Sequence, residues 1–178
     1  MADVTFGRGT FWQRTDTSRF TLLASDLNPH DGHPCMRADF RHLPYAAGTI
    51  DVLVLDPPYL HSGGAHETAG RFGLSTSPNM YHADIMALYA AGMAEAARVL
   101  RPGGRLWVKC KDQVQREQQC WSHIEIHAAA TGIGFTARDL FVLVAAGMAG
   151  TNRWPVQHHA RKTHSFMWIF ELPGISCA

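Results

Sequence analysis

Short apolar segments alternate with longer amphipathic segments along this chain. Such alternation is typical of a mostly parallel β-sheet covered by helices. Residues 50–55 are almost all β-branched or leucine, which predicts a strand that is buried on both faces near the centre of the sheet. The other apolar segments predict strands at residues 20–25, 36–38, 105–109, 136–144 and 166–171. We therefore expect an α/β fold with a doubly wound sheet of about seven strands.

Two segments have the periodicity of helices. Apolar positions recur near every 3.6 residues from 83 to 100, which predicts an amphipathic helix. Arg101-Pro102-Gly103-Gly104 follows, and we expect it to end the helix, because proline disfavours a helical residue before it and glycine permits a turn. A second helix is expected at 121–131. Two long connections, 60–82 and 145–163, are of a length that often carries function in a compact domain.

Composition limits the class of protein. With 178 residues, 46% of them hydrophobic, the chain can bury one core, so we expect a single domain over residues 1–178. The four cysteines are scattered and show no Cys-x-x-Cys spacing, which favours a reduced, cytoplasmic protein. No apolar run approaches the ~20 residues that cross a bilayer, and no signal sequence is evident. The eleven histidines complete no recognisable ligand set, so no metal is expected.

Charge is distributed unevenly although its total is small. A formal net charge of +1 gives no indication of nucleic-acid binding by itself. Between Asp139 and Glu171, however, no acidic residue occurs. The basic side chains of this stretch are Arg153, His158, His159, Arg161, Lys162 and His164. This basic segment is either a nucleic-acid contact or a solvated loop before the last strand.

The sequence Asp56-Pro57-Pro58-Tyr59 directly follows the predicted central strand. Ligands of open α/β sheets bind beyond the carboxyl ends of the strands. Two consecutive prolines stiffen the turn and leave its carbonyls free as acceptors. The exocyclic amino group of a base is a poor nucleophile with two N–H donors, and the Asp56 carboxylate and Pro57 carbonyl can accept one bond each. Tyr59 offers a ring on which the base can stack.

Asp56-Pro57-Pro58-Tyr59 resembles the catalytic motif of the S-adenosylmethionine-dependent amino-methyltransferases that modify adenine N6 or cytosine N4 in DNA. Members with Asp at the first position are mostly adenine enzymes, so the resemblance favours adenine. It implies a Rossmann-like methyltransferase fold, S-adenosyl-L-methionine as cofactor, and direct methyl transfer to a base flipped out of the duplex. RNA methyltransferases that act on guanine N2 or adenine N6 have similar loops.

The cofactor half of the same family resembles the start of this chain. Gly7 and Gly9 let the backbone approach a ligand, and a helix expected near Phe11 would direct its N-terminal donors at the methionine carboxylate. Asp26 lies 17 residues beyond Gly9, near the offset at which an acid accepts hydrogen bonds from ribose hydroxyls. The resemblance implies cofactor contacts from Asp3, Thr5, Phe6, Gly7, Gly9, Thr10, Asp26, Asp39 and Phe40.

Three further features bear on the resemblance. The family core has five or so apolar residues before the position of Asp3, whereas only two residues precede it here, so we expect a short first strand or a start further upstream. Residues 98–109 resemble the helix-turn-strand that follows the catalytic loop in many methyltransferases. Lys162-Thr163-His164 resembles the Lys-x-His segment of the DNA-methylating members. The resemblance implies substrate contacts from Lys162 and His164, and the basic segment adds Arg153 and Trp154 as expected substrate contacts.

The sequence shows no separate segment for recognition of a target site. DNA enzymes of this family usually carry a recognition segment the size of a small domain, and no stretch here is long enough. We expect a short or relaxed sequence preference, or recognition through a second subunit, which includes a second copy of the chain. DNA is the favoured partner. The alternatives are an RNA base methyltransferase and a non-catalytic, nucleic-acid-binding subunit that keeps the fold.

Overall fold

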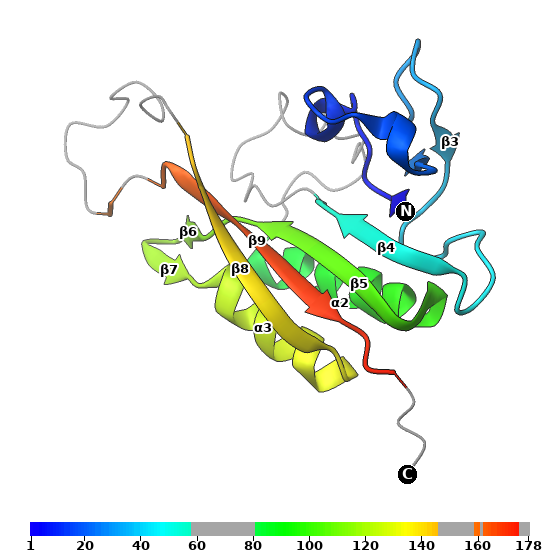
Figure 1. Ribbon diagram of the computed structural model, residues 1–178. Helices are drawn as coiled ribbons and strands as arrows, with labels where there is room; N and C mark the ends of the chain where they lie inside the picture. Colours follow the sequence, from blue (N-terminus) through cyan, green and yellow to red (C-terminus); the bar gives the residue numbers. More distant parts are fainter. Residues whose placement is uncertain (58–80, 146–158, 161, 175–178) are drawn as a thin grey trace.

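The computed structural model describes residues 1–57, 81–145, 159–160 and 162–174 (Figure 1). They form a seven-stranded sheet with the order β3-β2-β1-β4-β5-β9-β8. Strand β9 runs antiparallel to both of its neighbours, β5 and β8, and all other neighbouring strands of this sheet are parallel. The strands are β1 (Ala2–Asp3), β2 (Leu23–Asp26), β3 (Met36–Arg37), β4 (Ile50–Leu55), β5 (Leu100–Cys110), β8 (Thr136–Val144) and β9 (His164–Glu171). The predicted doubly wound, mostly parallel sheet is confirmed.

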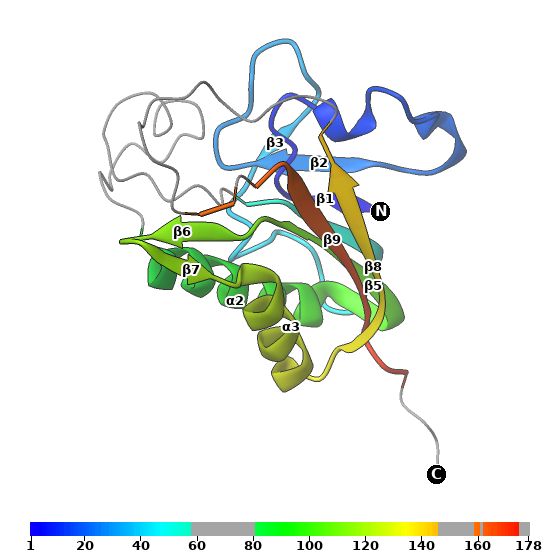
Figure 2. The same cartoon turned by 90° about the vertical axis from the view of Figure 1, so that its left-hand side faces the viewer.

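Helices α2 (His82–Val99) and α3 (Ser122–Ile133) cover one face of this sheet (Figures 1 and 2). The buried side chains of α2 recur three or four residues apart, and they pack with β4 and β5 in the main core. Both helices begin and end within two residues of the predicted bounds. None of the described helices is long and apolar enough to span a membrane.

Strand β5 begins with a bulge where the sequence predicted a turn. Ile50 pairs with Leu100, but Val52 pairs with Arg105, so residues 101–104 are accommodated between the two pairs. A Cβ atom at Gly104 would lie 2.7 Å from the carbonyl oxygen of Arg101. A glycine is therefore required at position 104. The helix does end at Val99, as expected, but the chain enters the strand at once instead of turning first.

Two local predictions were wrong or incomplete. The helix expected near Phe11 is a single 3-10 turn, η1 (Thr10–Trp12). A small hairpin, β6 (Gln113–Gln115) and β7 (Gln118–Cys120), was not predicted. Its two turn residues, Arg116 and Glu117, have φ angles of 48° and 63°. Hairpin turns of this kind usually contain glycine or asparagine, so the sequence carried no turn signal here.

Candidate active site

The strand order reverses between β1 and β4, because the chain proceeds from β1 to β2 on one side and from β4 to β5 on the other. Ligands of doubly wound folds bind at the carboxyl ends of the strands at such a reversal. Acidic residues end or directly follow three of the strands at this edge. Asp3 ends β1, Asp26 ends β2, and Asp56 follows β4. The predicted catalytic residue is thus brought to the same edge as two of the predicted cofactor residues.

The loop after β1 is shaped by its glycines. Gly7 and Gly9 have φ angles of 56° and 66°, in the left-handed region that favours glycine. The N–H of Gly7 donates to Oδ2 of Asp26 at 2.8 Å, which ties the loop to the end of β2. A Cβ atom at Gly9 would lie 2.8 Å from the Phe6 ring. Thr10 then begins the 3-10 turn.

Asp3 is a buried carboxylate, 2% exposed. Its Oδ2 accepts a hydrogen bond from the indole Nε1 of Trp12 at 2.7 Å, and its Oδ1 accepts one from the Thr5 N–H at 3.0 Å. Burial raises the pKa of Asp3 to about 6, although these hydrogen bonds act to lower it. Because both oxygens are bonded within the chain, Asp3 holds the loop in place.

Asp56 is placed by the pairing of β4 with β5. Leu55 pairs with Val108, so Asp56 lies beside Lys109, whose Nζ donates to Oδ2 of Asp56 at 2.7 Å. The backbone N–H of Asp56 donates to Oγ1 of Thr5 at 2.7 Å. Oδ1 of Asp56 is buried and makes no hydrogen bond to a described residue. Burial raises the pKa of Asp56, and Lys109 acts to lower it. One carboxylate oxygen is thus fixed, and the other remains as an acceptor.

Two other predicted cofactor residues, Asp39 and Phe40, follow β3. Asp39 forms an ion pair with Arg41 at 2.6 Å, and this pair lowers the pKa of Asp39. Phe40 packs against α2, where a Cβ atom at Gly92 would lie 3.0 Å from its ring. Pro57 is buried at the end of the described loop. The remaining predicted residues, Pro58, Tyr59, Arg153 and Trp154, lie outside the described residues.

Lys162 and His164 lie at the same edge of the sheet as Asp56. Phe166 of β9 pairs with Cys110, the last residue of β5, so the start of β9 lies beyond the carboxyl end of β5. Nζ of Lys162 is 5.5 Å from the ring centroid of Trp121, which is half exposed. The ring of His164 meets that of Phe166 edge to face. A basic and aromatic surface therefore adjoins the edge of the sheet that carries Asp3, Asp26 and Asp56, which we call the acidic edge.

Lys109 and Trp12 were not singled out from the sequence. Both contact an acid at this edge, but each contact depends on strand pairing or a loop path that no local pattern encodes. Lys109 does alternate with Val108 and Cys110, which are buried, and this alternation indicates that its side chain is directed away from the core. Among the described residues, no group of three His, Cys, Asp or Glu side chains is placed to hold a metal ion.

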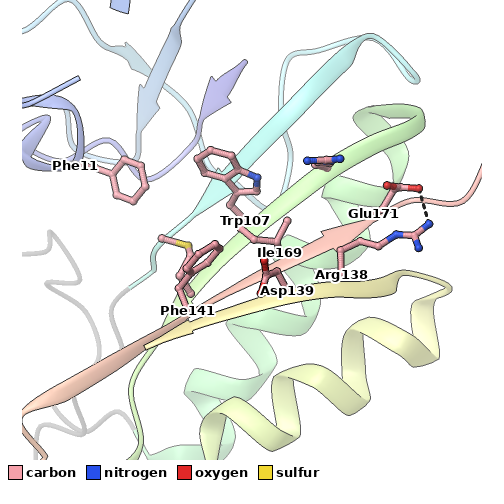
Figure 3. A pocket seen from close by; sticks show the side chains of 9 residues that line it. Phe11, Trp107, Arg138, Asp139, Phe141, Ile169 and Glu171 are labelled. Carbon is pink, nitrogen blue, oxygen red and sulfur yellow. Dashed lines mark hydrogen bonds and ion pairs between the residues drawn. The ribbon is translucent and has the colours of Figure 1, made fainter. Parts of the chain in front are cut away.

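A hollow of about 650 Å³ lies elsewhere, on the sheet face opposite α2 and α3 (Figure 3). The ion pair between Arg138 and Glu171 crosses one end of it. Its lining residues are Phe11, Arg105, Trp107, Arg138, Asp139, Phe141, Met167, Ile169 and Glu171. None of the predicted site residues lines this hollow, so the candidate active site is the acidic edge and not the hollow.

No protein-family model and no curated protein sequence matches the chain. Several solved structures do. An S-adenosylmethionine-dependent methyltransferase from Methanosarcina mazei matches with a TM-score of 0.58 at 12% identity, over 97% of this chain and 92% of that one. The PvuII DNA methyltransferase, which is cytosine-N4-specific, matches with a TM-score of 0.53 at 11% identity, over 72% of this chain and 44% of that one.

A protein of Thermus thermophilus that is predicted to be a DNA modification methylase matches with a TM-score of 0.54 at 18% identity, over 77% of this chain. This chain covers 52% of that protein, which has also been crystallised with S-adenosyl-L-methionine. The chain thus spans about half the length of the Thermus protein. At these identities the comparisons establish the fold, which is the Rossmann-like methyltransferase fold.

Proposed function

We propose that this chain is an S-adenosylmethionine-dependent methyltransferase acting on an exocyclic amino group of a nucleic-acid base, with adenine N6 in DNA as its substrate. The observation that carries the proposal is Oδ1 of Asp56, a buried acceptor without a described partner at the point where the strand order reverses. An amino group bound there can donate one N–H to Oδ1. The Pro57 carbonyl is the proposed acceptor for the second N–H.

The residues at the ends of β1 and β2 fit the cofactor. Gly7 leaves the loop without a side chain at a position where an added Cβ atom would have no neighbour closer than 4.0 Å, so a ligand can approach the backbone there. Each carboxylate oxygen has two lone pairs, so Asp26 can accept from a ribose hydroxyl while it holds the Gly7 N–H. When bound, S-adenosyl-L-methionine supplies an electrophilic methyl carbon on a sulfonium, with a neutral thioether as the leaving group.

Catalysis by this site is mainly a matter of orientation. Bonding both amino hydrogens to fixed acceptors turns the nitrogen lone pair toward the methyl carbon. A nitrogen that gains a methyl group becomes positively charged, and the ionised Asp56 carboxylate stabilises that charge. The proton that the nitrogen then releases leaves through Asp56 or to water. In a duplex, the base has to be flipped out before its amino group can reach Asp56.

The substrate side of the proposal rests on the surface that adjoins the acidic edge. Lys162 can contact a phosphate, and Trp121 offers an exposed ring on which a base can stack. His164, Arg153 and Trp154 are further proposed substrate contacts. We further propose that residues 1–178 act as one domain, with a short or relaxed sequence preference unless a second subunit supplies recognition.

The proposal is tested by incubating the protein with labelled methyl donor and duplex DNA, single-stranded DNA or RNA. Mass spectrometry of the digested nucleosides then identifies the product. N6-methyldeoxyadenosine supports the proposal. N4-methyldeoxycytidine would change the target base to cytosine and leave the rest of the proposal as it stands. Methylated ribonucleosides alone would assign the chain to RNA. Cofactor binding measured by calorimetry, without methylation of any nucleic acid, would favour a non-catalytic subunit.

A further inference from the structure

A lysine lies against the proposed catalytic carboxylate. Nζ of Lys109 is 2.7 Å from Oδ2 of Asp56, and the two side chains are only 22% and 25% exposed. Lys109 is the second-last residue of β5, and Asp56 directly follows β4. The pairing of these two strands places the Lys109 and Asp56 backbones next to each other, and this fixes the contact between their side chains.

We infer that Lys109 is a positioning residue for methyl transfer: its ammonium group holds Oδ2 of Asp56, so that Oδ1 alone faces the amino group of the base. The inference rests on the proposed function and adds a residue to it. A carboxylate on a single bond can rotate and offer either oxygen. An ion pair to Oδ2 removes that freedom and leaves the buried Oδ1 as the acceptor.

The charges around Asp56 give Lys109 a second effect. Asp3 on β1 is a nearby acid, and the charge of Asp56 acts to raise the pKa of Asp3. Cys110 on β5 is a buried thiol whose pKa is raised mainly by burial, so it stays neutral. Lys109 supplies the positive charge that acts to lower the pKa of Asp56 against its burial. An ionised carboxylate accepts hydrogen bonds only, which is the state that an amino donor requires.

Lys109 is itself anchored from the helix layer. The hydroxyl group of Tyr89, a residue of α2 that is 1% exposed, donates to the backbone carbonyl of Lys109 at 2.8 Å. The end of β5 is thereby tied to the core. Because the backbone of Lys109 is held in this way, the position from which its side chain extends to Asp56 is fixed.

The test compares Lys109→Met with Lys109→Arg and with Lys111→Met, a matched control two residues along the chain. We expect Lys109→Met to lower kcat about 10- to 100-fold, since loss of one preorganised polar partner has effects of this order or larger. The dissociation constant for S-adenosyl-L-methionine should stay within about threefold of wild type. Lys109→Arg keeps a cation and should recover part of kcat, and Lys111→Met should behave as wild type.

The pH profile separates positioning from simple damage to the fold. Without the ammonium group, the pKa of the Asp56 carboxyl rises, so the acid limb of the kcat profile should move to higher pH. Lys109→Arg should keep the wild-type limb, and if Lys109→Met proves unstable, Lys109→Gln removes the same charge with a polar side chain and is measured in its place. An unmoved limb with kcat within threefold of wild type in Lys109→Met overturns the inference. A wild-type protein that methylates no nucleic acid overturns the proposed function and this inference together.

Discussion

Two aspartates on neighbouring strands, Asp3 and Asp56, differ in how their oxygens are used. Both oxygens of Asp3 accept hydrogen bonds from the loop that follows β1, and the side chain is almost fully buried. Asp56 has one oxygen in an ion pair with Lys109 and one without a described partner. The first arrangement stabilises a loop, and the second leaves an acceptor for a ligand. Both are aspartates at the carboxyl ends of neighbouring strands, so the local partners decide between structure and chemistry.

The largest effect is expected from Asp56→Ala. Removing the acceptor should lower turnover by about 10² to 10³, by analogy with deletion of one preorganised polar partner at other active sites. Cofactor binding, measured by calorimetry, should change little, because the proposed cofactor contacts lie at and beyond the ends of β1, β2 and β3. Asp56→Asn is the matched control and should also lose activity, since its one amide oxygen pairs with the Lys109 ammonium group and an N–H donor then replaces Oδ1. Turnover of Asp56→Ala within threefold of wild type would remove Asp56 from the mechanism.

Asp3→Ala should act on stability first. The substitution leaves the Trp12 indole N–H and the Thr5 N–H without their acceptor, which costs about 2 kcal/mol of unfolding free energy. Urea unfolding at pH 7 measures the loss. Trp12→Phe removes only one of the two bonds and should cost less. If Asp3→Ala unfolds at the wild-type urea concentration, the proposed role of Asp3 in holding the loop is wrong.

The same variant has a predicted pH dependence. Because the pKa of Asp3 is raised to about 6 from 3.8, the folded protein binds this proton more tightly than the unfolded chain does. The contribution of Asp3 to stability is then fully present below about pH 4 and decreases as pH rises to about 6. The stability difference between wild type and Asp3→Ala should shrink over that window by about 2 to 3 kcal/mol. A difference that grows with pH would contradict the assignment.

Thr5→Val tests the link between Asp3 and Asp56, and its effect on stability should be smaller than that of Asp3→Ala. Oγ1 of Thr5 accepts from the backbone N–H of Asp56, while the Thr5 N–H donates to Asp3. Valine keeps the shape and the N–H but removes the oxygen, so the cost is about 1 to 2 kcal/mol. We also expect lower turnover, because the start of the catalytic loop loses its anchor. Thr5→Ser keeps the oxygen and should be close to wild type in both measurements.

The smallest effect is expected from Arg101→Ala, at the opposite end of β5 from Lys109. Arg101 pairs with Asp51 at the surface, and both side chains are more than half exposed. Exposed ion pairs of this kind contribute about 0 to 1 kcal/mol. Thermal unfolding and turnover should both match wild type closely. A large loss of activity would mean that the acidic edge is not the whole of the active site.

The sequence predicted the elements better than the contacts between them. Residues 50–55 and 136–144 were placed with the bounds that β4 and β8 have, because both contain runs of β-branched, leucine or aromatic residues, which are strand signals. The bulge in β5 and the β6–β7 hairpin were missed, since they depend on register and on residues with positive φ that are not glycine.

For the candidate site too, the sequence indicated a local motif but not the contacts between distant segments. Asp56 stood out because of its neighbours along the chain, and the structure places it where the strand order reverses. Lys109 did not stand out, because its role comes from lying beside Asp56 across two strands that are separated by a helix in the sequence. Contacts between distant segments of this kind require the register of the sheet, which a local pattern does not contain.

The position of β9 has a consequence for biosynthesis. It follows every other described strand in the chain, yet it is inserted between β5 and β8. Until residues 164–171 leave the ribosome, β5 lacks one neighbour and the buried side chain of Phe170 is missing from the core. The nascent chain therefore exposes strand edges late into translation, a state in which partly folded chains are prone to aggregate and to need chaperones.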